Sequence, residues 1–239
     1  MHASDAGIAG FLSCGSEEAD WPEVDRTATD HAGVTPAFGI HPWYAKGRSP
    51  DWRNRLRERL LAWPGAPVGE IGLDHAIAER DDADQDRLFR EQLSLSIELD
   101  RPVCIHCRRA WDTLLRALRT GPCPARFMIH SFSGAAELVP PLAGLGAYFS
   151  FSGTITWSRN RRAHAALAAV PPDRLLIETD APDLPPAPDQ QTGVHGEVNE
   201  PANLRRVLTA AAERLHVEEE ELAERTWENA MRFLGIRTA

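Results

Sequence analysis

Four short apolar segments, each followed directly by acidic or histidine side chains, constrain the fold of this chain more than any other feature. Each segment has the length of a buried strand, and the polar residues come where that strand ends. The segments are Ala66-Pro67-Val68 before Gly69-Glu70-Ile71-Gly72-Leu73-Asp74, Val103-Cys104-Ile105 before His106, Phe127-Met128-Ile129 before His130, and Leu175-Leu176-Ile177-Glu178-Thr179 before Asp180. We interpret them as parallel strands that carry their polar residues to one rim of a barrel.

Helical patterns lie between these segments, so the chain alternates strand and helix throughout. Further strands are expected at 8–13, 34–40 and 147–152, and helices at 17–32 (with Ser16 as N-cap), 51–63, 84–99, 110–119, 135–143, 160–169, 201–215 and 218–234. Strands that are apolar on both faces indicate a parallel sheet covered by helices. A doubly wound open sheet is the rival, but no Gly-rich phosphate-binding turn follows the first strand. We therefore predict an α/β fold, a TIM-type (β/α) barrel, with residues 1–239 forming a single domain.

The overall charge excludes nucleic-acid binding by a positive field that covers the whole protein. The formal net charge is −9 with a pI near 5.5, so nucleic acid has to be bound locally rather than by a positive field over the whole protein. No apolar run is long enough for a membrane span, and the N-terminus does not resemble a signal peptide, so a cytoplasmic location is expected. Cys104 and Cys107 flank His106 at a strand end, and we interpret them as reduced structural thiols.

The polar residues at the strand ends are suited to metal-assisted hydrolysis. Two carboxylates, Glu70 and Asp180, and two imidazoles, His106 and His130, form a ligand set for a divalent ion. Imidazole favours zinc, iron or manganese, and carboxylate oxygen also accepts magnesium. A bound ion lowers the pKa of a water molecule, and Asp180 would accept its proton as general base. No Gly-x-Ser-x-Gly motif offers a competing nucleophile.

Six motifs in order resemble one known family, the TatD-type deoxyribonucleases, which are metal-dependent hydrolases with a barrel related to the amidohydrolases. The motifs are GEIGLD, PVCIHCRRA, HSFSG, YFSFSGTIT, LLIETDAPDLPP and NEPANL, and the resemblance covers about residues 7–234. It includes GIHPWYA, in which His41 matches a recurrent His-Pro turn.

The resemblance implies a role for each matching residue. Glu70 would bridge two divalent ions (Mg, Mn or Zn), His106 and His130 would complete the ligands of one, and Asp180 would bind the other and align the attacking water. Glu178 and Asp74 would contact and orient these ligands without binding metal themselves. Arg108 and His41 would contact the substrate, which the family implies to be DNA, cleaved from a 3′ end.

The chain also departs from the family pattern. Family members begin with a strand bearing His-x-His, and this chain has no such motif, so we expect the barrel to lack its first strand here and the true start codon to lie upstream. With those ligands missing, we expect one metal to bind more firmly than the second, and hydrolysis to be slow. Arg109 and Asp183 replace an acidic and an aromatic residue, and the loop before Asn199 lacks the usual basic run.

Two other functions remain open from the sequence. The same barrel could hydrolyse another ester or amide, such as a misacylated-tRNA bond, because a barrel does not fix its substrate. A degenerate, non-catalytic barrel that binds a protein partner is the third hypothesis.

Overall fold

The computed structural model describes residues 3–188 and 198–236, and these form two compact units. The first unit contains residues 10–130 and 233–236, and the second contains residues 3–9 and 131–232. Each is described by itself below. That residues 1–239 form one domain stays a prediction.

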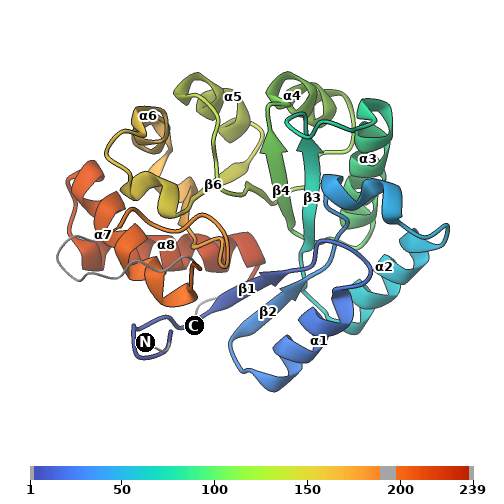
Figure 1. Ribbon diagram of the computed structural model, residues 1–239, viewed down its shortest axis with the longest axis horizontal. Helices are drawn as coiled ribbons and strands as arrows, with labels where there is room; N and C mark the ends of the chain where they lie inside the picture. Colours follow the sequence, from blue (N-terminus) through green and yellow to red (C-terminus); the bar gives the residue numbers. More distant parts are fainter. Residues whose placement is uncertain (1–2, 189–197, 237–239) are drawn as a thin grey trace. The chain divides into compact units, whose positions relative to one another are not determined.

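The first unit alternates strands and helices, and all of its strands are parallel (Figure 1). Its elements are β1 (Phe11–Cys14), α1 (Trp21–Asp30), β2 (Val34–Ala37), the 3-10 helix η1 (Pro42–Gly47), α2 (Trp52–Ala62), β3 (Val68–Asp74), α3 (Asp82–Glu98), β4 (Val103–Arg108), α4 (Trp111–Thr120) and β5 (Phe127–Ile129). β1 pairs with β2, and β4 pairs with both β3 and β5. A single bridge between Phe38 and Val68 joins the chain just after β2 to β3.

The apolar runs of β3, β4 and β5 are buried, as the sequence pattern predicts. Val68, Val103, Ile105 and Phe127 are all fully buried. Figure 1 shows α3 and α4 beside β3 and β4. Strands buried on both faces read as continuous hydrophobic runs, which is why their positions could be predicted.

The pairing of β3 with β4 leaves no room for a side chain at Gly72. It is the register partner of His106, and its φ of +154° is one that L side chains rarely adopt. A Cβ at this position would lie 1.9 Å from the carbonyl oxygen of His106. Only glycine therefore fits here, because any side chain would push the two strands apart.

The second unit is also built from parallel strands and helices. Its elements are η2 (Ala136–Leu138), α5 (Val139–Ala143), β6 (Ala147–Phe151), η3 (Gly153–Thr156), α6 (Arg161–Ala169), η4 (Pro172–Arg174), β7 (Leu175–Ile177), η5 (Pro201–Asn203), α7 (Leu204–Leu215) and α8 (Glu219–Leu234). β6 pairs with β7 in register from Phe149 and Leu175 onward. Asn229 of α8 donates hydrogen bonds of 2.8 Å to the carbonyl oxygens of Pro172 and Leu175, which fastens this helix to the start of β7.

Three predicted helices differ from the observed ones in ways that local chemistry explains. α1 begins at Trp21 rather than at 17, and Ser16 is not its N-cap: the Ser16 amide and hydroxyl both donate to the Asp20 carboxylate in a turn before the helix. Pro22 suits the first turn of a helix and not its interior. The segments 135–143 and 201–215 each begin with a 3-10 turn. Part of the loop expected at 182–196 lies outside the described residues.

Within the described part of the chain, no helix combines the length and the apolar character needed to cross a bilayer.

We predict that Gly72→Ala lowers the free energy of unfolding by about 3 kcal/mol or more, because it adds both an unfavourable φ and a backbone overlap. Two matched variants separate these causes. Gly65 has a φ of +91° in open space, so Gly65→Ala should cost about 1 kcal/mol, and Gly47→Ala, also in open space, should change stability by less than about 0.5 kcal/mol. Urea unfolding of the three variants measures this, and equal losses for Gly72→Ala and Gly65→Ala would contradict the close approach.

Candidate metal centre

The strand ends of the first unit bring three predicted ligands together. Glu70 lies within β3, His106 lies near the end of β4, and His130 directly follows β5. The His130 amide donates to the carbonyl oxygen of Ile105 at 2.9 Å, which continues the pairing of β4 and β5 beyond the last residue of β5. The sequence pattern placed Glu70 at a strand end, but β3 continues to Asp74, and the register of β3 against β4 shifts between Val68 and Ile71. The Glu70 side chain nevertheless lies beside those of His106 and His130.

Glu70 is at the centre of this group. Its Oε1 lies 3.3 Å from His106 Nδ1 and 3.0 Å from His130 Nε2. That oxygen is buried and has no hydrogen bond of good geometry. The side chains of Glu70, His106 and His130 are only 18%, 15% and 14% exposed. Spacings near 3 Å occur between atoms that share an ion through bonds of about 2.0–2.2 Å, and they occur equally between hydrogen-bonded atoms. That Glu70, His106 and His130 bind a divalent metal stays a prediction.

Asp74 fixes the orientation of the His106 ring. It is fully buried, and its Oδ2 lies 3.1 Å from His106 Nε2 and accepts the Trp43 indole N–H at 2.7 Å. Its Oδ1 accepts the Ala76 amide at 2.7 Å. With the ring proton held on Nε2 by this carboxylate, the Nδ1 lone pair faces Glu70. Carboxylates orient metal-binding histidines in this way, so Asp74 supports His106 and has no free oxygen of its own for metal.

His41 lies against the same group. It is 6% exposed, its ring centroid is 4.3 Å from that of His106, and its ligand atom lies within 4.8 Å of those of Glu70 and His106. Proximity alone would make it a metal ligand. However, its Nδ1 accepts the backbone N–H of Trp43 at 3.2 Å, so the neutral ring carries its proton on Nε2. A nitrogen that carries a proton donates a hydrogen bond and does not bind metal, so we assign His41 as a donor.

Burial and mutual interaction set the protonation states of the group. Burial acts to raise the pKa of Glu70, but His130 and His106 outweigh it and lower that pKa to about 2. Burial, followed by the charge of His106, lowers the pKa of His41 to about 3. Burial also acts to lower the pKa of His106, but hydrogen bonds with Asp74 and Glu70 outweigh it, and this pKa is raised. At neutral pH, Glu70 is thus ionised and His41 is neutral.

Two glutamines of α3 form hydrogen bonds with the backbone at Asp74 and directly before His41. Neither glutamine was assigned a role in the site from the sequence alone. Gln85 accepts the Asp74 amide at 3.0 Å and donates to the Asp74 carbonyl at 3.2 Å. Gln92 does the same for Ile40, directly before His41, at 2.8 and 3.1 Å. Both glutamines are buried and lie seven residues apart on one helix face. A buried-side glutamine pair at helical spacing is the signal that could have identified them.

The remaining predicted site residues are placed as follows. Arg108 is exposed at the end of β4. Glu178 and Asp180 belong to the second unit, where the Glu178 carboxylate accepts the Ser131 amide and the Ser150 hydroxyl, each at 2.6 Å. Asn199 donates to the carbonyl oxygens on either side of Asp180, those of Thr179 and Asp183, at 2.7 Å. The convergence of Asp180 with Glu70 stays a prediction.

Comparison with known proteins identifies the family of the chain. A family profile described as "TatD related DNase" matches residues 1–235. The chain is 29% identical to the metal-dependent hydrolase YjjV of Escherichia coli, covering 99% of this chain and 90% of that protein. It is 34% identical to the metal-dependent hydrolase YabD of Bacillus subtilis, over 91% and 85% of the two chains. It is 30% identical to the 3′-5′ ssDNA/RNA exonuclease TatD of Klebsiella pneumoniae, over 97% and 88%.

Solved structures confirm the predicted fold class. The crystal structure of Escherichia coli YjjV superposes with a TM-score of 0.90 at 29% identity, over 98% of this chain and 90% of that one. A TatD-family hydrolase from Entamoeba histolytica has the same fold, with a TM-score of 0.84 at 19% identity over 97% and 86%. The fold is the α/β barrel of TIM type found in these TatD-family structures. By its sequence over nearly the whole length and by its fold, the chain belongs to the TatD family of metal-dependent hydrolases.

Proposed function

We propose that this chain hydrolyses phosphodiester bonds of single-stranded DNA or RNA, from the 3′ end, with the aid of a divalent metal. The observation that carries the proposal is the position of the buried Glu70 Oε1 atom, which lies 3.3 Å from His106 Nδ1 and 3.0 Å from His130 Nε2. Relatives named as 3′-5′ ssDNA/RNA exonucleases support the substrate class.

Glu70, His106 and His130 would hold the ion in this proposal. When bound, the ion supplies an activated water and a Lewis acid for the phosphate. Asp74 keeps the proton on His106 Nε2, so that Nδ1 stays available as a ligand atom. The Nε2–H of His41 donates to a phosphate oxygen, and the exposed Arg108 adds positive charge for the same group. Asp180 takes the proton of the attacking water, with Glu178 supporting it.

We predict that Glu70→Gln and Asp180→Asn each lower kcat by about 100-fold or more, because each removes a charge that acts in the chemical step. Glu79→Gln, at an exposed position on the loop after β3, is the matched control and should retain parental activity. The assay follows 3′- and 5′-labelled single-stranded oligonucleotides after stripping of metal and re-addition of Mg, Mn or Zn. An aminoacyl ester is assayed in parallel, and faster metal-dependent cleavage of that ester would contradict the phosphodiester assignment.

Metal affinity should depend on Asp74, although its carboxylate does not bind the ion in this proposal. We predict that Asp74→Asn weakens metal binding by about 10- to 100-fold, because the His106 ring loses the acceptor that fixes its tautomer. Isothermal titration of the metal-free chain measures this directly. An affinity equal to that of the parent would show that Asp74 does not orient His106.

In the metal-free chain, His41 should make folding sensitive to mild acid. Its pKa is about 3 in the folded state against 6.5 in the unfolded state, so the unfolded chain binds more protons as the pH falls. The free energy of unfolding should therefore decrease from pH 6.5 to 4.5 by at most roughly 1.4 kcal/mol per unit.

The other groups of the site whose pKa values are shifted do not contribute to the decline between pH 6.5 and 4.5. The lowered pKa of Glu70 matters only below 4.5, and the stabilisation from the raised pKa of His106 is complete below 6.5. His41→Asn should flatten the decline, as measured by urea unfolding in the presence of a chelator. An unchanged slope in the variant would contradict the assignment of a buried neutral His41.

A further inference from the structure

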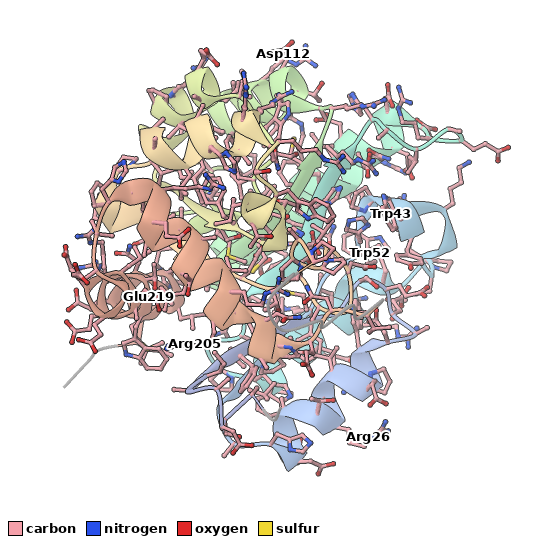
Figure 2. The ribbon with its side chains drawn as sticks, turned by 60° about the vertical axis from the view of Figure 1, so that its left-hand side comes forward. Arg26, Trp43, Trp52, Asp112, Arg205 and Glu219 are labelled. Atoms are coloured by element: carbon pink, nitrogen blue, oxygen red, sulfur yellow. The ribbon has the colours of Figure 1, made fainter. Side chains whose placement is uncertain are left out.

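The η1 turn places an exposed aromatic ring beside the buried residues of the metal centre. Trp43 is 53% exposed and lies at the surface (Figure 2). Its ring centroid is only 6.3 Å from that of His106. About half of the Trp43 residue is thus exposed to solvent next to His106.

Trp43 is held in place although it is exposed. Its indole N–H donates to Asp74 Oδ2 at 2.7 Å, and its ring meets the His41 ring edge to face at a centroid distance of 5.0 Å. A ring fixed in this way loses little conformational entropy when a ligand packs against it. The hydrogen bond to Asp74 explains the orientation of the ring, but it does not explain why the ring is left uncovered.

The spacing in η1 predicts a cation on the same side as Trp43. Lys46 is exposed and comes three residues after Trp43, and side chains at this spacing eclipse one another in a 3-10 helix. Lys46 is also the only lysine of a chain whose net charge is −9. An aromatic face with a neighbouring cation is the arrangement that binds a base and a phosphate of single-stranded nucleic acid.

We propose that Trp43 and Lys46 form a nucleotide platform, in which Trp43 stacks on the base next to the cleaved bond and Lys46 pairs with a neighbouring phosphate. The nature of the ligand rests on the proposed function. The platform deepens that function, because it identifies a base-contacting residue outside the group that holds the metal. A substrate without bases would lose this contact.

The proposed stacking is tested by removing the nucleotide base and the Trp43 ring in separate experiments. Binding is measured by fluorescence anisotropy with 5′-labelled oligonucleotides protected by 3′ phosphorothioates, in which one abasic site is moved stepwise from the 3′ end. For the parent, one position should weaken binding by about 10-fold when its base is absent. Trp43→Leu should bind the intact oligonucleotide about 10-fold more weakly and lose nothing further at that position.

A second variant separates stacking from the contact with Asp74. Trp43→Phe keeps an aromatic face but lacks the N–H donor, so it should retain most of the base dependence. Equal abasic penalties in the parent and in Trp43→Leu at every position would overturn the platform, as would the absence of oligonucleotide binding by the parent. The latter result would instead favour a protein partner on this surface.

Salt dependence tests the role of Lys46. Lys46→Gln should reduce the slope of log affinity against log salt concentration by about 0.7, the value for one phosphate contact on a single strand. Arg119→Gln removes one exposed charge from the last turn of α4 and is the matched control that should leave the slope unchanged. The same change in both variants would show a general charge effect and overturn the contact.

The platform and the proposed activity can fail independently. Binding with a strong Trp43–base coupling, but without cleavage of any phosphodiester, would disprove the hydrolase proposal and leave the platform standing. Cleavage without any coupling between Trp43 and a base would disprove the platform and leave the hydrolase proposal intact.

Discussion

The first unit is arranged around one buried negative charge. Glu70 has little access to water, and an ionised carboxylate in such a place is tolerated only beside compensating groups. His106 and His130 provide that compensation, and Asp74 in turn holds His106. Gly72 lets the strand of Glu70 pair with the strand of His106, because a side chain at that position would overlap the His106 backbone. A hydrophobic residue in place of Glu70 would relieve the electrostatic cost, so the carboxylate is best explained by a function.

The sequence predicted those parts of the structure that depend on local pattern. Continuous apolar runs identified β3, β4 and β5, and the polar residues that follow or interrupt these runs, Glu70, His106 and His130, lie within hydrogen-bonding distance of one another, although Glu70 lies inside β3 rather than at its end. The start of α1 was misjudged because Ser16 resembles an N-cap, whereas Asp20 takes both of its donors and Pro22 belongs in a first turn. The start of α1 could be predicted from the sequence only by considering that the Asp20 carboxylate accepts hydrogen bonds from Ser16.

Other parts of the site depend on contacts between distant segments, which a single sequence does not encode visibly. Gln85 and Gln92 lie at helical spacing, but the sequence does not show which backbone they pair with, that of Asp74 and that of Ile40. The link from Trp43 to Asp74 joins residues 31 positions apart. His41 was identified through its His-Pro turn, but its tautomer follows only from the bond that it accepts at Trp43.

The single lysine of the chain has a practical consequence. Amine-selective reagents distinguish lysine from arginine, so they would modify this protein at the Lys46 side chain and otherwise only at an α-amino group. A fluorophore or surface tether could therefore be attached to η1 without engineering any other position. The same chemistry offers a direct footprint, since whatever covers η1 would shield this amine from acylation.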